Sequence, residues 1–264
     1  MNEKQVYVES VGLVAPGMIG WAAGAPVLAG EVPYAPAELT PYAPELLPPN
    51  ERRRATPVTR LAFRTAEDAM RGSSRPASEL ATVFGSSDGD TDVMNRINIA
   101  LAQPQRALSP TDFHNSVHNA PAGYWSIAVG SRLPSTSLAA HDAIFSASLL
   151  EAAALLLGDG IGTLLAVYDV RMPVPLDQKR PIPEPFGSAL VLRPEPGERA
   201  LARLTFKRGD AAETRMRDPA LEQLRRANPA ARALPLLELL ARRATGTVHL
   251  PAQDGTLTLT VSAP

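Results

Sequence analysis

The feature that most constrains the fold is an apolar run from 143 to 157, AIFSASLLEAAALLL. A helix built from it is apolar nearly all round, and such a helix is normally buried inside a large domain. Asp142 precedes the run and Gly158 follows it, which is typical of an N-cap and of the residue that ends a helix. We therefore expect a long buried helix over 143–157, capped by Asp142 and surrounded by other elements.

Segments typical of strands and of helices alternate along the rest of the chain. Strands are expected over 5–15, 80–85, 163–168, 188–193 and 200–207, followed by a terminal hairpin of 246–251 and 256–262. Helices are expected over 58–70, 91–102, 218–226 and 233–243. Prolines crowd 30–57 and 173–185 and predict irregular loops there. This interleaving predicts an α/β protein.

The composition excludes several classes of function. With 26 Lys+Arg against 27 Asp+Glu, the chain lacks the basic excess of most nucleic-acid binders. It contains no cysteine, so disulfides, thiolate metal sites and cysteine nucleophiles are ruled out. We find no phosphate-binding or dinucleotide-binding glycine motif, no apolar run of about 18 residues and no signal pattern. We expect a soluble cytoplasmic protein without a cofactor and without a nucleic-acid or membrane partner.

Two candidate metal sites are weak. The run 88–92 begins like a calcium-binding loop, but Val93 and Ile99 stand where that loop needs glycine and glutamate. His114 and His118 have the spacing of zinc ligands on a helix, but neither a companion glutamate nor a thiolate accompanies them. We expect no metal site.

One catalytic pattern is open. Residues 85–89, GSSDG, match the G-x-S-x-G turn of α/β-hydrolases after a predicted strand, with Asp169 and His249 following in the order of that family's triad. A serine hydrolase using Ser87, Asp169 and His249 is therefore one hypothesis. The alternative is a glycine-rich turn between a strand and a helix, since no oxyanion segment precedes it.

Residues 116–127, SVHNAPAGYWSI, and 130–140, GSRLPSTSLAA, resemble the β-ketoacyl synthases of the thiolase superfamily. In those proteins an N-x-x-A-G stretch, an apolar strand and a Gly-Pro-Ser turn lead into the catalytic cysteine. The matching residues are Asn119, Ala122, Gly123, Gly130, Pro134 and Ser135, whereas Leu133 replaces the expected glycine. Further stretches at 10–16, 61–70, 83–86 and 185–192 extend the resemblance over about residues 5–210.

The resemblance implies a thiolase-like layered αβαβα fold with a shortened second half. One domain would cover 1–264, with an N-terminal half over 1–183 and a truncated C-terminal half over 184–264. Counting without a gap places the nucleophile at Asp142, next to His141. A carboxylate is a poor substitute for a thiolate at a helix N-terminus. The two further catalytic groups, usually histidines, also lack a match, because only His249 lies beyond His141.

The resemblance therefore implies a subunit that does not catalyse. It is similar to the chain-length factors of type II polyketide synthases, and in its short form to subunits of bacterial aryl polyene pathways. Such a subunit pairs with a cysteine-bearing ketosynthase, shapes the acyl tunnel and meets acyl carrier protein indirectly. A homodimeric scaffold without an acyl ligand is a further hypothesis. The residues expected at the tunnel or the subunit interface are Asp88, Met94, Phe113, His114, Val117, His118, Asn119, Tyr124, Ser135 and Ser137.

Overall fold

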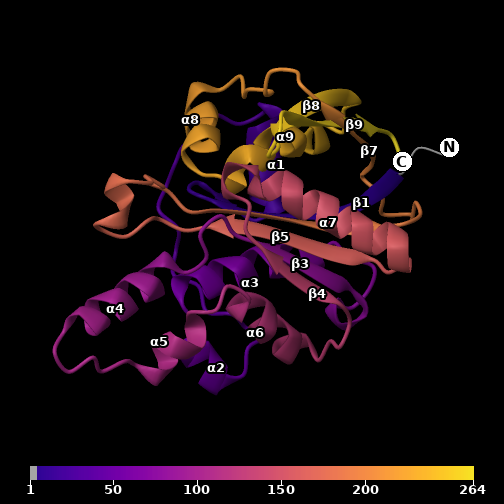
Figure 1. Cartoon of the computed structure of the whole chain (residues 1–264). Helices are drawn as coiled ribbons and strands as arrows, with labels where there is room; N and C mark the ends of the chain where they lie inside the picture. Colours follow the sequence, from indigo (N-terminus) through magenta and orange to yellow (C-terminus); the bar gives the residue numbers. More distant parts are fainter. Residues whose placement is uncertain (1–4) are drawn as a thin grey trace.

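A computed structural model describes residues 5–264, and its strands form one mixed sheet (Figure 1). The order within the described residues is β4-β3-β5-β6-β1-β7-β9-β8, and the short β2 pairs with β1. The strands are β1 (Gln5–Ala15), β2 (Met18–Ile19), β3 (Ala81–Gly85), β4 (Ser135–Leu138), β5 (Thr163–Asp169), β6 (Phe186–Arg193), β7 (Ala202–Gly209), β8 (Gly246–Pro251) and β9 (Thr256–Ser262).

The parallel part of the sheet lies at one edge. Strand β3 pairs in parallel with β4 on one side and with β5 on the other. From β5 onward the pairs β5–β6, β6–β1, β1–β7, β7–β9 and β9–β8 are antiparallel. Because parallel strands end at the same edge of a sheet, the loops after β3, β4 and β5 converge.

Helices cover both faces of the sheet (Figure 1). Strand residues facing α3 and α6 form one apolar cluster, whereas those facing α7 and α9 form another. The helices are α1 (Trp21–Ala29), α2 (Pro49–Arg54), α3 (Pro57–Met70), α4 (Thr91–Ala102), α5 (Pro110–Asn115), α6 (Ala120–Val129), α7 (Ile144–Asp159), α8 (Pro219–Ala227) and α9 (Leu234–Ala241).

Helix α7 is the long helix that the apolar run predicts. Its side chains Ile144, Phe145 and Leu149 are buried against the sheet, so the expected core position is confirmed. Its predicted ends are wrong. Asp142 lies in a 3-10 turn, His141–Ala143, and does not cap the helix, because its carboxylate is bonded elsewhere. The helix runs through Gly158 and ends at Gly160, which takes the left-handed conformation.

Together with the turn before it, α7 is long and apolar enough to cross a membrane by length and composition. The sequence alone did not suggest this. Half of the apolar window of His141–Asp159 is buried within the fold. Burial of this kind is what the core helix of a globular domain shows.

Several prolines begin helices in this chain. The sequence predicts irregular structure over 30–57 and leaves 110–121 without a regular helix, but Pro49, Pro110 and Pro121 each lie in the first turn of α2, α5 and α6. Proline fits there because the first turn of a helix leaves its N–H groups unbonded. Helix α1 is a further element that the sequence did not predict.

The C-terminal segment extends the sheet with β9 and β8, and its helix α9 packs against one face. The hairpin predicted over 246–251 and 256–262 is confirmed as β8 and β9. Its apolar side chains, Val248 and Leu259 among them, pack in the same cluster as the leucines of α9. In Figure 1 α9 and α1 lie between this hairpin and strands β3 and β5, so the layered α/β arrangement expected from the sequence is confirmed.

Candidate functional site at the carboxyl edge of the parallel strands

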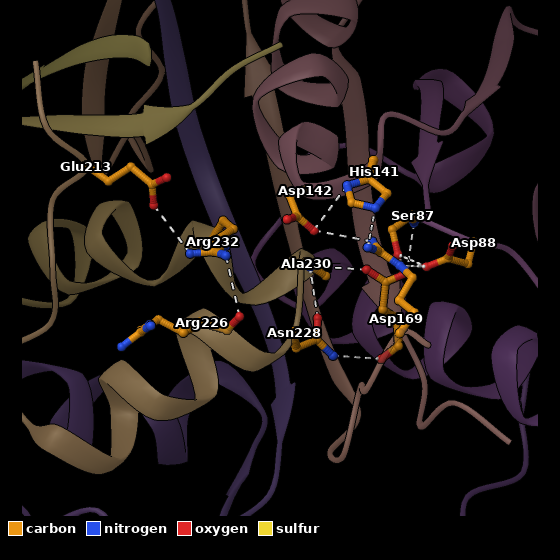
Figure 2. A network of polar contacts seen from close by, with 11 residues as sticks. Ser87, Asp88, His141, Asp142, Asp169, Glu213, Arg226, Asn228, Ala230 and Arg232 are labelled. Atoms are coloured by element: carbon orange, nitrogen blue, oxygen red, sulfur yellow. Dashed lines mark hydrogen bonds and ion pairs between the residues drawn. The ribbon is translucent and has the colours of Figure 1, made fainter. Parts of the chain in front are cut away.

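Polar side chains gather where β3, β4 and β5 end. Ser86, Ser87 and Asp88 follow β3, whereas Asp169 is the last residue of β5. His141 and Asp142 follow β4 after a short connection. The topology thus brings together residues 82 positions apart, as the bond between Ser87 and Asp169 shows (Figure 2). Crevices at the carboxyl ends of strands are the usual binding sites of α/β sheets.

Asp169 lies at the centre of this edge and is 3% exposed. Its Oδ1 accepts hydrogen bonds from the Ser86 hydroxyl at 3.0 Å and from the Ser87 N–H at 2.8 Å. Its Oδ2 accepts from the Ala230 N–H at 3.1 Å, and Asn228 donates to its backbone oxygen at 3.2 Å. The carboxyl group therefore joins the ends of β3 and β5 to the turn at 230–233.

Burial raises the pKa of Asp169 to about 7, and the charge of nearby Asp88 acts in the same direction. The hydrogen bonds from Ser87 and Ser86 oppose that rise because they favour the carboxylate. A buried carboxyl group with this many donors stabilises the local structure, and it is poised to change charge near neutral pH.

Arg180 closes the edge from the loop between β5 and β6. Its Nε donates to Asp88 Oδ2 at 2.6 Å, and a terminal nitrogen donates to Asp142 Oδ1 at 3.3 Å. Its other terminal nitrogen bonds His141 Nε2. The Arg180 guanidinium thus contacts the side chains of Asp142, of its neighbour His141 and of Asp88.

The contact with Arg180 fixes the tautomer of His141. An arginine only donates hydrogen bonds, so His141 Nε2 accepts here and the ring proton lies on Nδ1. Nδ1 is 3.4 Å from Asp142 Oδ1. The backbone of His141 takes a left-handed φ of 48°, which few non-glycine residues adopt. The turn before α7 is therefore held in an uncommon shape by the side chains of His141, Asp142 and Arg180.

The serine-hydrolase triad is not assembled, so that prediction is wrong. Ser87 contacts Asp169 directly, with its hydroxyl 3.0 Å from Oδ1, and no imidazole lies between them. The ring of His249 bonds Thr258 Oγ1 at 3.0 Å, across the β8–β9 hairpin. A triad needs the histidine between serine and carboxylate. The G-x-S-x-G segment is here the turn that leads from β3 towards α4.

The two histidines with zinc-like spacing do not meet. His114 lies on α5, with its ring edge-on to Tyr124 at 5.8 Å, whereas His118 follows that helix and contacts Ser86 O at 3.1 Å. The acidic run 88–92 caps a helix, since Asp90 Oδ1 accepts from the Val93 N–H at 3.0 Å. In residues 5–264 no group of three His, Cys, Asp or Glu side chains could hold a metal ion.

The remaining expected site residues fall into two groups. Met94, Phe113 and Val117 are exposed on the face made by α4, α5 and the segment after α5, where Phe113 is 68% exposed. Tyr124 does not join them, because it is buried in the core beneath α6 and donates to Asn115 Oδ1 at 3.1 Å. Asn119 occupies the N-cap position of α6 without a side-chain cap bond.

Ser135 and Ser137 lie on β4, the strand at the edge of the sheet. The Ser135 hydroxyl accepts from Thr82 Oγ1 at 2.8 Å. The Thr82 N–H bonds Pro134 O and the Ser86 N–H bonds Leu138 O, so the even-numbered residues of β4 direct their backbone towards β3. The N–H groups of Ser135 and Ser137 therefore face the open edge.

Arg180 and Asn228 are the site residues that sequence reasoning missed. Arg180 lies in a proline-rich loop, 38 positions from Asp142, and no spacing links the two. Asn228 follows α8 and bonds backbone groups of both Asp169 and Glu184. Long-range contacts of this kind leave no local pattern, so the fold itself was needed to find them.

The comparisons with known proteins agree with this architecture. The sequence profile described as "Beta-ketoacyl synthase, N-terminal domain" matches residues 29–253. The chain belongs to the β-ketoacyl synthase family. No curated protein matches the sequence.

Several solved structures of the β-ketoacyl synthase family share the fold. One is the ketosynthase ApeO in complex with its chain length factor ApeC from Xenorhabdus doucetiae, with 22% identity, a TM-score of 0.74 and coverage of 97% of this chain and 99% of that chain. The ishigamide ketosynthase/chain length factor has 14% identity, a TM-score of 0.71 and coverage of 97% and 98%. The complex AntDE:AntF, a type II acyl-carrier protein with its ketosynthase bound to the hexaketide, has 12% identity, a TM-score of 0.72 and coverage of 99% and 100%.

These comparisons confirm the thiolase-like fold expected from the sequence. They also show that the chain is shorter than one of the matched synthases. The chain covers nearly all of the matched chains in those three complexes but 71% of a β-ketoacyl synthase from Burkholderia phymatum, which has a TM-score of 0.59. This member of the β-ketoacyl synthase family is therefore similar in length to the matched chains of the three complexes. It is shorter than the Burkholderia phymatum synthase.

Proposed function

We propose that this chain is a non-catalytic subunit that pairs with a cysteine-bearing ketosynthase and shapes its acyl tunnel during polyketide or polyene elongation. The observation that carries the proposal is the aspartate at position 142, in a chain that contains no cysteine. The family resemblance puts the nucleophile there, and the side chain present is a carboxylate bonded to Arg180 in a chain without cysteine. On this reading it is a pseudoenzyme, and the residues around 142 are vestigial.

The chemistry of the cluster supports this reading. A ketosynthase nucleophile must attack a thioester as a thiolate. The Asp142 carboxylate is a weak nucleophile, and Arg180 and the His141 ring occupy the space around it. Asp88, which the resemblance places near the acyl pocket, is bonded to the same guanidinium. The contacts of Arg180 with Asp88, His141 and Asp142 stabilise the turn before α7.

The surface that would meet the partner is apolar and has an open strand edge. Exposed large apolar side chains are concentrated on α4, α5, α6 and their connections, where a contiguous apolar surface suits a protein interface. Helices α4, α5 and α6 lie on the same side of the molecule as α2, opposite to α8 and α9 (Figure 1). Next to them β4 offers unpaired backbone groups, as edge strands do. The exposed large apolar residues of α4, α5, α6 and their connections are Met94, Ile99, Leu101, Leu108, Phe113, Val117 and Ile127.

The solved complexes named above support the identity of the partner and the setting of the reaction. Two of them pair a ketosynthase with a chain length factor, and the third contains an acyl-carrier protein. By analogy we infer a heterodimer that acts on carrier-bound acyl chains in the cytoplasm, with aryl polyene biosynthesis as the pathway class. The whole chain, 1–264, would act as one synthase-like domain with halves at 1–183 and 184–264.

Co-expression with a cysteine-bearing ketosynthase from the same genome, followed by size-exclusion chromatography, tests the proposal. We expect a one-to-one complex that Val117→Asp disrupts, because a charge would be buried in an apolar interface. Val32→Asp is the matched control, since Val32 is similarly exposed, at 49% against 53%, but follows α1. The proposal is contradicted if the chain elutes as a monomer with every candidate ketosynthase, or if it forms a homodimer.

A further inference from the structure

A second polar cavity lies apart from the carboxyl edge, between the loop after β7, helix α8 and the turn at 230–233. Its volume is about 370 Å³. Arg215, Arg226 and Arg232 stand around it, and Arg225 lies at its base with two glutamates (Figure 2 shows Arg226, Arg232 and Glu213). Four guanidinium groups face two carboxylates, so the lining has a net charge of +2. The complete lining is Ala212, Glu213, Arg215, Glu222, Arg225, Arg226 and Arg232.

The two carboxylates are largely committed to Arg225, whose side chain is 4% exposed. Glu222 accepts from Arg225 with both oxygens, at 2.7 and 2.9 Å, and these bonds lower the pKa of Glu222. Glu213 Oε2 accepts from Arg225 at 2.8 Å. The fork–fork pair of Arg225 and Glu222 lies within α8, whereas the bond from Arg225 to Glu213 and that from the Met216 N–H to Glu222 hold the loop against the helix. These bonds leave little negative charge for the other three arginines.

Arg232 is half-buried and has weaker partners than Arg225. It shares Glu213 Oε2 with Arg225 at 3.3 Å and donates to the backbone oxygen of Arg226 at 3.4 Å. Its Nε is buried and finds no acceptor among residues 5–264. Burial lowers the pKa of Arg232, and the charge of Arg225 acts in the same direction. An anion bound in the cavity would offset the excess positive charge of the lining.

Arg215 and Arg226 complete the arrangement at the mouth of the cavity. Both are exposed, and within the described part of the chain neither side chain forms an ion pair or a hydrogen bond. The Arg232 guanidinium at one side and the two free guanidinium groups at the mouth can surround a tetrahedral oxyanion. Guanidinium forks match phosphate oxygens in geometry as well as in charge.

We propose that this cavity is a binding site for a phosphate dianion, either free phosphate or the phosphate of a monoester. The charge of a monoester near neutral pH, about −1.5 to −2, matches the net charge of the lining. The site lies beside α8, whereas the exposed apolar surface lies over α4, α5 and α6 on the other side of the molecule (Figure 1). It would therefore stay accessible when that surface is covered, and it does not depend on the function proposed above.

Isothermal titration of the full chain with inorganic phosphate, at constant ionic strength set with chloride, tests the site. A second titration with glycerol 3-phosphate distinguishes free phosphate from an ester as the preferred ligand. We expect a dissociation constant of about 1 mM or tighter for at least one of them. Absence of binding to both at concentrations about tenfold higher would overturn the proposal.

The variant Arg215→Gln/Arg226→Gln should bind phosphate at least about tenfold more weakly, which corresponds to about 1.4 kcal/mol. Both residues are exposed, so the urea midpoint should stay at its wild-type value. Arg217→Gln is the matched control, because Arg217 is an exposed arginine of the same loop that does not line the cavity. Equal affinity in the double variant and the control would overturn the proposal. If the double variant is unstable, Arg226→Gln alone must show the weaker binding.

Discussion

Arg180 donates a hydrogen bond to Asp142 at 3.3 Å although 38 positions separate the two residues. The same guanidinium reaches Asp88, so the loop between β5 and β6 is tied to the ends of β3 and β4. In the family to which this chain belongs, the resemblance assigns position 142 to a nucleophile. The contacts of the Arg180 guanidinium with Asp142 and His141 help to hold the turn before α7 in its shape.

Replacing Arg180 should test these contacts. We expect Arg180→Ala to lower the free energy of unfolding by about 1–2 kcal/mol. In that variant Asp88 and Asp142 lose the guanidinium that bonds both of them, and His141 loses its hydrogen-bond donor. Arg171→Ala is the control, since Arg171 is 65% exposed and pairs with Glu184 at 3.4 Å; such a pair contributes less than about 1 kcal/mol. Urea denaturation measures both. Equal effects would mean that the contacts of Arg180 have no special role.

Asp169 should make stability depend on pH. Its folded pKa is about 7, above the ordinary value, so between about pH 4 and 7 the folded state holds a proton that the unfolded chain has lost. Rising pH therefore lowers the unfolding free energy through this group, and the effect levels off above about pH 7.

The variant Asp169→Asn replaces the titrating carboxyl group with an amide that does not change charge with pH. We expect the stability advantage of the wild type over the variant to fall by on the order of 3 kcal/mol from pH 4 to pH 7. Denaturation curves at a series of pH values measure the difference, and comparing two proteins cancels the titration of all other groups. A difference that rises with pH would show that the hydrogen bonds from Ser86 and Ser87 outweigh burial.

The open edge of β4 gives a prediction about assembly. Ser137 directs its N–H away from β3, so Ser137→Pro should leave the subunit folded while preventing a second chain from pairing along this edge. We expect loss of the ketosynthase complex in size-exclusion chromatography with an unchanged melting temperature. Thr136→Pro is the matched variant, and it should destabilise the subunit itself because the backbone of Thr136 faces β3. Retention of the complex by Ser137→Pro would exclude strand pairing as the mode of assembly.

Phe113 gives a prediction about product length. Its side chain is 68% exposed on α5 and is the bulkiest group on the proposed partner face. In the active pair, Phe113→Ala should lengthen the products by opening the tunnel, with little effect on stability. Tyr124→Phe is the control, because Tyr124 is buried in the core and should leave product length unchanged. Mass spectrometry of carrier-bound products measures both, and identical product distributions for wild type and Phe113→Ala would remove Phe113 from the tunnel.

Much of the fold follows from local patterns in the sequence. The 143–157 run predicts a buried helix because few of its residues are polar, and Asp254-Gly255 between alternating segments predicts the terminal hairpin. The prolines of 30–57 predict an irregular loop, but Pro49 begins a helix, as do Pro110 and Pro121 further along the chain. A proline fits both contexts, and tertiary packing decides between them.

The site was less predictable than the fold. The position of Asp142 came from counting along a family motif, but its expected role as a helix cap was wrong because Arg180 takes its carboxylate. Ser87, Asp169 and His249 stand in the chain order of a hydrolase triad, yet His249 bonds Thr258 in a hairpin. Chain order constrains spatial position weakly when the partners come from different strands. Contacts such as Asp88 with Arg180 depend on how the loops at the strand ends meet.

The most direct test of the central claim is turnover of an acyl thioester by the purified chain, measured alone and in complex with its ketosynthase. We predict no condensation by the chain alone, condensation by the complex, and complete loss when the ketosynthase's catalytic cysteine is replaced by alanine. Condensation by this chain alone, or by a complex that lacks the partner's cysteine, would contradict the account.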